Sequence, residues 1–295
     1  VRMSPRFGSV ITAMVTPFDD RGDLDLDAAV DLAVWLVANG SDGLVLSGTT
    51  GESPTLSESE ELVLFRTIRG AVTVPILAGA GSNSTASAVE QTKRASELGV
   101  DGILSVTPYY NRPSQAGLEA HFTAVAEATD LPVVLYDIPA RTGRKIATDT
   151  VLRLAHEVPN IVALKDAAGD PAETARLIAQ APSGFEVYCG DDALTLPLLA
   201  VGAVGVISVA SHWVGRQLGE LIEAVSKGDL ELARRINAGL IASYDYESGD
   251  EAPNPIPTKT LLRVLGLRVG DCRPPMGPAP DWLADRARQV LKDLN

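Results

Sequence analysis

Short apolar runs recur along the first two-thirds of the chain, each four to six residues long and rich in valine, isoleucine and leucine. Glycine, proline, asparagine or aspartate bounds each run. Because most runs are apolar on both faces, they are typical of strands buried in a parallel sheet. The predicted strands are Val10–Val15, Gly43–Ser47, Val74–Gly79, Gly102–Val106, Val133–Tyr136, Ile161–Lys165, Glu186–Cys189 and Gly205–Val209.

The segments between these runs have the period of amphipathic helices. From Leu26 to Val37, apolar residues recur every three or four positions and form one stripe. Aspartates precede this segment and Asn39-Gly40 follows it, as expected at the two ends of a helix. Further predicted helices are Ser57–Arg69, Thr85–Leu98, Ser114–Thr129, Thr148–His156, Pro171–Gln180 and a short Asp192–Ala200.

Eight strand-like runs that alternate with helices indicate a parallel α/β sheet, either open and doubly wound or closed into a barrel. An open sheet with a dinucleotide site would show GxGxxG after its first strand, but Thr16-Pro17-Phe18 stands there. Gly79-Ala80-Gly81 after the third run lacks the later glycine. Eight units over about 225 residues favour closure, so we predict a (β/α)8 TIM barrel.

The pattern changes after Lys227-Gly228, where no further strand candidates occur. Three helices separated by breaks rich in glycine and proline are predicted at Leu230–Tyr244, Pro257–Leu265 and Pro280–Leu294. We therefore expect a catalytic barrel over residues 1–228 and a small C-terminal helical extension over residues 229–295.

Composition restricts the function classes. The 295 residues carry a net charge of −13, which would repel nucleic acid and acidic membrane surfaces, so neither is an expected partner. No apolar run is long enough to span a membrane, and the N-terminus lacks the apolar region of a signal peptide. Cys189 and Cys272 lie far apart without CxxC spacing, which indicates neither a zinc site nor a disulfide framework. The expected location is the cytoplasm.

Candidate chemistry lies directly after the strands, where barrel enzymes carry their active sites. Lys165 closes the sixth strand, at the mouth of an apolar barrel. Loss of hydration there would lower the pKa of the amine and free it to attack a carbonyl group. From this run alone, a strand-end lysine that extends to solvent is an equally good interpretation. Its position on the rim that bears the other motifs favours a nucleophile.

Hydroxyl groups and one arginine share this rim. Tyr136, Thr49 and Thr50 could relay protons, although each taken singly fits a structural role in a strand end or a turn. Arg141 suits bidentate binding of a carboxylate, with a surface ion pair as the alternative. Asp191-Asp192 could be an acid pair or a metal site, but a helix cap is the favoured interpretation.

Metal and serine-hydrolase chemistry have little support in the sequence. The three histidines, His121, His156 and His212, are scattered without HxH or HxxxH spacing, so structural roles are expected and no metal site is predicted. No GxSxG motif is present for a hydrolase nucleophile.

Taken together, these residues resemble the dihydrodipicolinate synthase family over essentially the whole chain. The motifs that carry the resemblance are Thr12–Phe18, Gly48-Thr49-Thr50-Gly51-Glu52-Ser53, Thr107–Pro113, Tyr136–Arg141, Lys165, Gly190-Asp191-Asp192 and Pro253-Asn254-Pro255-Ile256-Pro257. The resemblance implies condensation of pyruvate with aspartate 4-semialdehyde on the path to lysine and diaminopimelate. A sugar-acid aldolase with the same barrel, or a catalytically silent barrel, are the alternatives.

The resemblance also implies the catalytic roles. Lys165 would form an imine with pyruvate and thus make a separate cofactor unnecessary. Tyr136, Thr49 and Tyr110 would relay protons. Tyr110 would be contributed across the tight dimer interface of a homotetramer, a dimer of dimers.

The substrate-binding roles follow in the same way. Thr50 would help to hold pyruvate, and backbone groups of Gly190 and Ile207 would face the ligand. Arg141 would bind the carboxylate of the semialdehyde. The arginine would thereby supply local positive charge in a chain whose net charge is −13.

One departure from the family pattern concerns feedback by lysine. Lysine-inhibited members use histidines in the helix after the Gly48–Ser53 loop and a glutamate early in the next helix. Here the corresponding positions hold Glu58, Glu61 and Ser87. We therefore predict weak or no inhibition by lysine.

Overall fold

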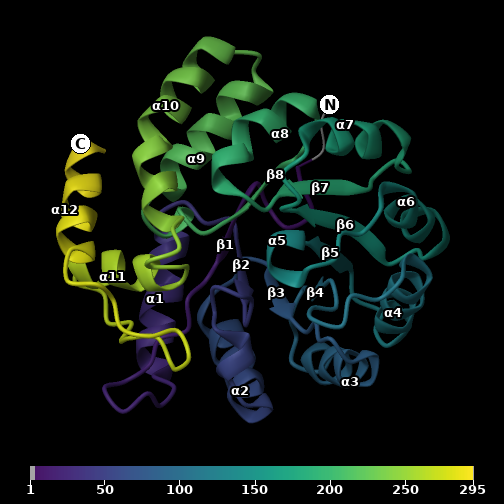
Figure 1. Ribbon diagram of the computed structural model, residues 1–295, viewed down its shortest axis with the longest axis horizontal. Coiled ribbons are helices and arrows are strands. Elements are labelled where there is room, and N and C mark those ends of the chain that lie inside the picture. The colour runs from purple at the N-terminus through teal and green to yellow at the C-terminus, as the bar shows by residue number, and fades with distance from the viewer. Residues whose placement is uncertain (1–3, 295) are drawn as a thin grey trace.

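The structure is a computed structural model that describes residues 4–294, in which eight parallel strands pair in chain order and close into a barrel. The prediction of a (β/α)8 TIM barrel is confirmed (Figure 1). The strands are β1 Val10–Ala13, β2 Gly43–Leu46, β3 Ile76–Gly79, β4 Gly102–Val106, β5 Val133–Asp137, β6 Ile161–Asp166, β7 Glu186–Cys189 and β8 Gly205–Ser208.

Helices surround the barrel on its outer side (Figure 1). The α-helices of the barrel are α1 Leu26–Ala38, α2 Glu58–Ala71, α3 Thr85–Ser96, α4 Gln115–Glu127, α5 Pro139–Thr142, α6 Thr148–Glu157, α7 Pro171–Gln180, α8 Thr195–Val201 and α9 Ser211–Ser226. Two short 3-10 helices are η1 Ser53–Thr55 and η2 Asp192–Leu194. Their order confirms the alternation expected from the sequence, although α5, α9 and η1 were not predicted.

Four strands are shorter than predicted: β2 and β8 by one residue, and β1 and β3 by two residues, the latter two each for a local reason. β3 begins at Ile76 rather than Val74 because Pro75 has no N–H group to donate to a neighbouring strand. β1 ends at Ala13 rather than Val15 because the Val15 N–H group donates to the imidazole of His212, 3.1 Å away.

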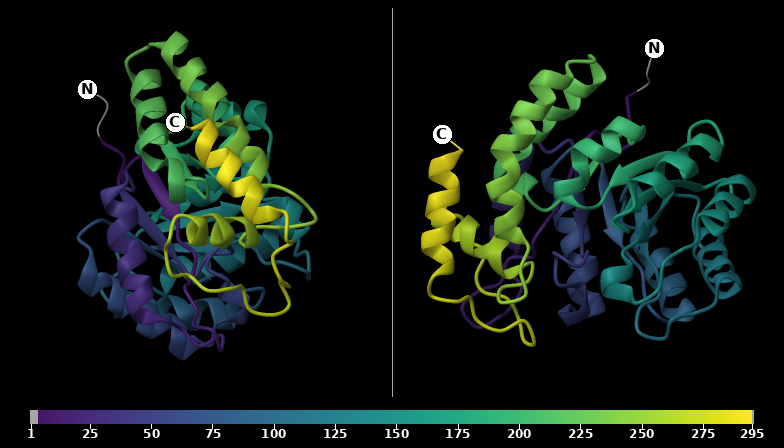
Figure 2. Two further views of the ribbon diagram at one scale, coloured as in Figure 1. Left: turned by 90° about the vertical axis from the view of Figure 1, so that its left-hand side faces the viewer. Right: turned by 45° about the horizontal axis from the view of Figure 1, so that its top comes forward.

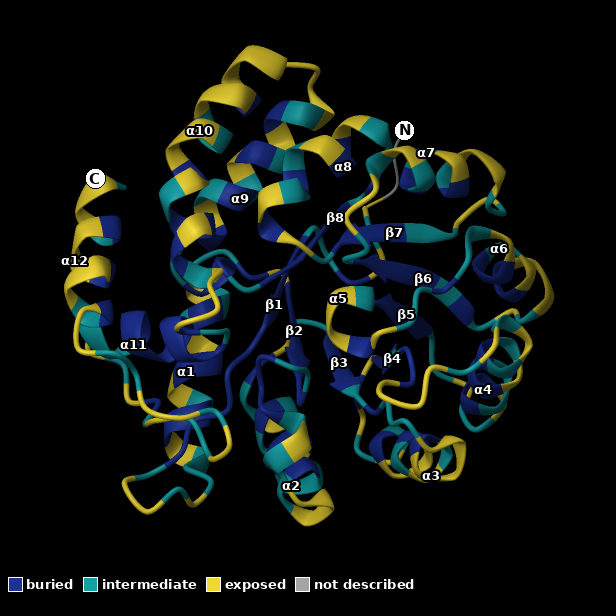
Figure 3. Ribbon diagram, viewed as in Figure 1, coloured by how far each residue is buried: buried dark blue, intermediate teal, exposed yellow. Residues whose placement is uncertain are grey.

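Alternate strand residues divide the core into two layers. One set fills the barrel interior, and the other packs between the strands and the helices, so the strands are buried on both faces (Figure 3). The buried interior residues are Phe7, Ile11, Ala13, Val45, Leu77, Leu104, Val134, Tyr136, Ala163, Tyr188 and Ile207. The interior is therefore apolar up to the rim on which the candidate residues stand.

The helix that follows β2 begins with a complete capping box. The Ser57 side chain accepts a hydrogen bond from the Glu60 backbone N–H, and the Glu60 carboxylate accepts one from the Ser57 N–H. Burial of Leu64, Phe65 and Ile68 then holds α2 against the barrel. The start of α2, and with it the end of the β2–α2 loop, is thus fixed by local sequence.

The C-terminal segment contributes three helices, α10 Leu230–Glu247, α11 Ile256–Val264 and α12 Leu283–Asp293. Figure 2 shows that the loop between α11 and α12 lies beside the N-terminal part of the chain, where the Phe18 N–H donates to the Val269 carbonyl at 3.2 Å. The proposed division into residues 1–228 and 229–295 falls in the turn between α9 and α10. Within residues 4–294, no helix is both long and apolar enough to cross a membrane.

Candidate active site

Lys165 stands near the end of β6, between two tyrosines on the neighbouring strands. Its Cα pairs with Tyr136 on β5 and with Tyr188 on β7. The ammonium nitrogen Nζ lies 4.1 Å from the centre of the Tyr136 ring. Only 5% of the residue is exposed, so the side chain does not extend into solvent. The structure therefore removes the interpretation of Lys165 as a solvent-exposed strand-end lysine.

Two lysines are strongly buried within residues 4–294, and their environments differ. Lys259, 1% exposed, forms an ion pair with Glu52 at 2.7 Å. By contrast, no carboxylate oxygen of residues 4–294 lies within 4.0 Å of Lys165 Nζ. Burial lowers the pKa of Lys165 to about 8, and the positive charge of Arg141 acts in the same direction, although Asp192 opposes it. Burial lowers the pKa of Lys259 as well, but the charge of Glu52 opposes that shift, so Lys165 is the buried amine that has no ion-pair partner among these residues to hold its proton.

Tyr136 provides a hydroxyl group beside this amine. Burial raises its pKa, and a hydrogen bond with Thr49 from the β2–α2 loop opposes part of that rise. The phenol is therefore protonated at neutral pH and offers one donor and one acceptor. Lys165, Tyr136 and Thr49, named separately in the sequence, are brought together at one end of the barrel.

Gly190 follows β7, and its backbone lies close to the Lys165 side chain. A Cβ atom built on Gly190 would lie 3.0 Å from Cγ and 3.1 Å from Cε of Lys165. Ile207, on β8, is buried in the barrel interior. The absence of a side chain at position 190 therefore leaves Lys165 free to extend toward the rim.

The substitution Gly190→Ala tests this contact. We expect the added methyl group to displace Lys165 by a few tenths of an ångström and to slow by about 10-fold the imine formation with pyruvate that the family resemblance implies, since small misplacements of reacting groups are costly. Stopped-flow measurement of pyruvate binding would check the rate. An unchanged rate in a folded variant would show that the lysine accommodates the methyl group.

Thr50 is buried beside a residue that the sequence analysis did not single out for a role. The Asn254 amide nitrogen donates to the Thr50 hydroxyl at 2.9 Å, across 204 positions of the chain. Asn254 was noted only as part of a motif between two prolines, and that motif was the one available signal. The C-terminal extension thus reaches the site.

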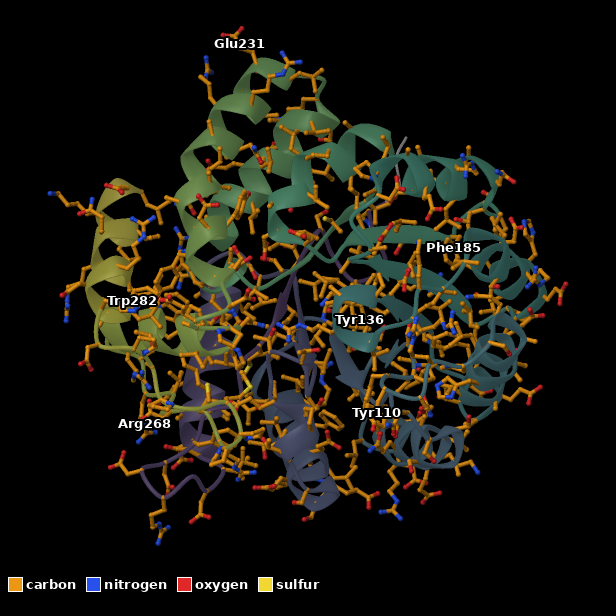
Figure 4. The ribbon with its side chains drawn as sticks, viewed as in Figure 1. Tyr110, Tyr136, Phe185, Glu231, Arg268 and Trp282 are labelled. Carbon is orange, nitrogen blue, oxygen red and sulfur yellow. The ribbon has the colours of Figure 1, made fainter. Side chains whose placement is uncertain are left out.

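Two expected site residues are exposed in the single chain. Arg141 lies on the short helix α5, and its charge influences the pKa values of both Lys165 and Tyr136. Tyr110 is 90% exposed, with a left-handed φ of 73°. Figure 4 shows Tyr110 apart from Tyr136. Within one chain, Arg141 is therefore near enough to act electrostatically on Lys165 and Tyr136. Tyr110, by contrast, does not contact the other candidate hydroxyl groups.

Backbone strain in residues 4–294 is concentrated on two loops of this rim. The non-glycine residues with left-handed φ are Ser47, Glu52, Tyr110 and Arg112, in the segments after β2 and β4. Each such conformation costs about 1–3 kcal/mol and persists only where its surroundings impose it. The two loops with the candidate threonines and the exposed tyrosine are thus held in unusual conformations.

The remaining polar candidates have structural contacts. Asp191 caps η2 as predicted. The carboxylate of Asp192 instead accepts from the Ser208 hydroxyl and from the N–H groups of Val209 and Ala210. It therefore secures the β8–α9 connection, and the helix cap predicted for this pair of aspartates is supplied by Asp191.

The histidines lie at the expected structural positions. His121 bonds to the Thr85 hydroxyl at 2.9 Å, and His212 links the Val15 N–H to the Val209 carbonyl. In the part of the chain that the structure describes, no group of three or more His, Cys, Asp or Glu side chains could hold a metal ion.

Comparison with known proteins agrees with this geometry. The sequence profile of the dihydrodipicolinate synthetase family matches residues 6–294. The chain belongs to this family. It is 50% identical over 291 residues to the 4-hydroxy-tetrahydrodipicolinate synthase of Thermosynechococcus vestitus, covering 98% of this chain and 97% of that protein. It is 47% identical to the synthase of Bacillus subtilis, covering 92% and 94%.

Solved structures of dihydrodipicolinate synthases share the fold. The enzyme DapA-2 from Bacillus anthracis superposes with a TM-score of 0.94 at 44% identity, covering 98% of both chains. The enzyme from Cyanidioschyzon merolae with lysine bound gives a TM-score of 0.95 at 45% identity, covering 99% of both. As a member of the dihydrodipicolinate synthetase family with such close full-length relatives, the chain is a lyase with 4-hydroxy-tetrahydrodipicolinate synthase activity.

Proposed function

We propose that the enzyme condenses pyruvate with aspartate 4-semialdehyde through an imine on Lys165. The observation that carries this mechanism is the buried, carboxylate-free amine at the rim of the barrel, 4.1 Å from the Tyr136 ring. A neutral amine is the nucleophile that a 2-oxo acid requires. The covalent chemistry is supplied by the lysine, so the reaction needs no separate cofactor.

Each step balances with the groups at hand. Lys165 Nζ attacks C2 of pyruvate, and loss of one water from the carbinolamine gives the imine. Removal of a methyl proton gives an enamine, whose carbon adds to the aldehyde while the aldehyde oxygen takes a proton. The amino group of the bound semialdehyde then adds to C2 and releases the Lys165 amine. The net reaction releases one water.

Proton transfers in these steps are assigned to Tyr136, Thr49 and the partner subunit's Tyr110. The first two lie close enough for the Thr49 hydroxyl to lower the pKa of Tyr136. Support for the third comes from the exposure and left-handed backbone of Tyr110, which suit a side chain that projects into another copy of the chain. The active form is accordingly a homotetramer, a dimer of dimers, in which the tight dimer completes each site.

The substrates are held by the remaining residues of the rim. Thr50 binds pyruvate, while backbone groups of Gly190 and Ile207 face it. Arg141 binds the carboxylate of the semialdehyde as a bidentate pair. We place the enzyme in the cytoplasm, where a reducing environment suits its two free cysteines, Cys189 and Cys272.

A direct assay tests the proposed substrate pair. We expect turnover with pyruvate and aspartate 4-semialdehyde, detected by pyruvate consumption and by mass spectrometry of the cyclic product. Cleavage of N-acetylneuraminate or 2-keto-3-deoxygluconate should be slower by orders of magnitude. Faster turnover of either sugar acid would overturn the assignment of the acceptor while leaving the lysine chemistry intact.

Imine formation should depend on pH through Lys165. With a pKa of about 8, the neutral amine is the minor form at pH 7, so the rate rises as pH increases toward 9 and then levels off. An ordinary lysine would give a rate that still rises near pH 10. Pre-steady-state pyruvate binding between pH 6 and about 10 measures the profile. A rate that still rises at pH 10, without reaching a plateau, would contradict a lowered pKa of Lys165.

Lysine should inhibit the enzyme weakly or not at all. Glu58 forms an ion pair with Arg94 on α3, Ser87 is exposed, and burial raises the pKa of Glu61 to about 8. A carboxylate already paired with Arg94 and a buried carboxyl group do not reproduce the hydrogen bonding of the two histidines. We expect the initial rate to be unchanged at about 1 mM lysine. This concentration half-saturates a site whose binding free energy is about −4 kcal/mol. Clear inhibition at submillimolar lysine would refute this.

A further inference from the structure

The β2–α2 loop, which carries Thr49 and Thr50, is connected to the C-terminal extension through Glu52. The Glu52 backbone N–H donates to the Thr49 carbonyl at 3.1 Å, so the conformation of the two residues is coupled. Glu52 has a left-handed φ of 58° and is buried. Because a non-glycine residue disfavours this backbone conformation, contacts with other parts of the chain must stabilise it.

The Glu52 carboxylate is held from the C-terminal side. Oε1 pairs with Lys259 of α11 at 2.7 Å, and Oε2 accepts from the Arg273 N–H at 2.8 Å. Lys259 in turn donates to the Asp271 carbonyl at 3.0 Å, and its Nζ lies 4.2 Å from the centre of the Phe18 ring. Both oxygens of the Glu52 carboxylate therefore have partners in the C-terminal extension.

Arg273 reinforces the same connection at the far end of the loop. Its guanidinium donates to the Thr55 carbonyl at 2.8 Å and pairs with Glu60, the capping residue of α2. It also lies 4.2 Å from the Phe18 ring centre. Phe18 thus packs against the cationic side chains of both Lys259 and Arg273.

Stability alone does not explain a buried pair of this kind. Removing two charges from water costs about as much as their attraction returns, and apolar replacements are often as stable. What a buried pair adds is a fixed orientation, because neither charged group can turn to solvent instead of its partner. Here the ion pair connects Lys259 of α11 to the β2–α2 loop, which contains Thr49 and Thr50.

We propose that Glu52 and Lys259 are positioning residues for the condensation: their buried ion pair, clamped by Arg273, holds Thr49 against Tyr136 and Thr50 in place. The inference rests on the proposed roles of the threonines. It makes the C-terminal extension part of the catalytic machinery of the barrel. Displacement of Thr49 would lower kcat, and displacement of Thr50 would raise KM for pyruvate.

Three variants test the proposal: Glu52→Gln, Lys259→Met and the double variant. Each single substitution leaves a polar or charged partner unmatched, so we expect a lower melting temperature together with a kcat reduced by about 10-fold or more. In the double variant no buried charge is left unpaired. We expect its melting temperature to return toward that of the unsubstituted enzyme while kcat stays low. Arg288→Met, on the exposed face of α12, is the control for charge removal in the extension.

Recovery of both kcat and melting temperature in the double variant would overturn the proposal, because the pair would then be only structural. If the single variants do not fold, Asn254→Ala gives a second measurement, since it removes the bond to Thr50 without leaving a buried charge. We expect it to raise KM for pyruvate several-fold, and an unchanged KM would count against the clamp. Borohydride trapping of pyruvate on Lys165 should persist in all variants. Failure of trapping in the unsubstituted enzyme would instead refute the imine mechanism.

Discussion

Replacing Lys165 with methionine is expected to abolish trapping of pyruvate by borohydride and to lower kcat at least about 10³-fold, because the nucleophile is removed. Methionine has a similar length and suits the apolar interior, so the barrel should remain folded. The measurement is the mass of the peptide that contains Lys165 after reduction, together with the steady-state rate.

Two controls separate nucleophilicity from charge and from burial. Lys165→Arg keeps the positive charge but provides no amine that can form an imine, so it should be as inactive as the methionine variant. Lys259 is equally buried, but its pairing with Glu52 keeps it out of reaction, and its peptide should stay unlabelled. A label on Lys259, or a persistent adduct in the methionine variant, would place the imine elsewhere.

The sequence was sufficient to predict the barrel and the rim on which Lys165 stands. Short apolar runs mark buried strands wherever both faces are covered, and the residues that follow them must meet at one end of a closed barrel. Pairing of Lys165 with Tyr136 in adjacent strands follows from that order. The depth of burial of the lysine, which lowers its pKa, depends on closure of the barrel and required the structure.

Contacts between distant segments could not be predicted in this way. Asn254 and Thr50 are 204 positions apart, and no periodic pattern connects them. The pair of Glu52 and Lys259 likewise depends on how the extension folds back, since either residue alone is typical of a solvated surface. The role proposed for Tyr110 requires another copy of the chain, so neither local pattern nor the fold of one chain places its side chain.

Replacing Arg141 with alanine should separate the two substrates. Because Arg141 is exposed on α5 rather than packed in the core, we expect little loss of stability. Loss of a charged hydrogen-bonding partner costs about 1.5–3 kcal/mol, which corresponds to about 10- to 100-fold in kcat/KM for aspartate 4-semialdehyde. Trapping of pyruvate should continue, because the lysine remains.

The same variant makes a second measurement on the lysine itself. The positive charge of Arg141 lowers the pKa of Lys165, so removing it should shift the pH profile of imine formation to higher pH. Arg141→Lys keeps the charge without bidentate geometry, so it should retain the original profile while binding the semialdehyde less well. If alanine left kcat/KM for the semialdehyde unchanged, the carboxylate would have to be bound by another group. If it left the pH profile unchanged, Arg141 would lie too far from the amine to influence it.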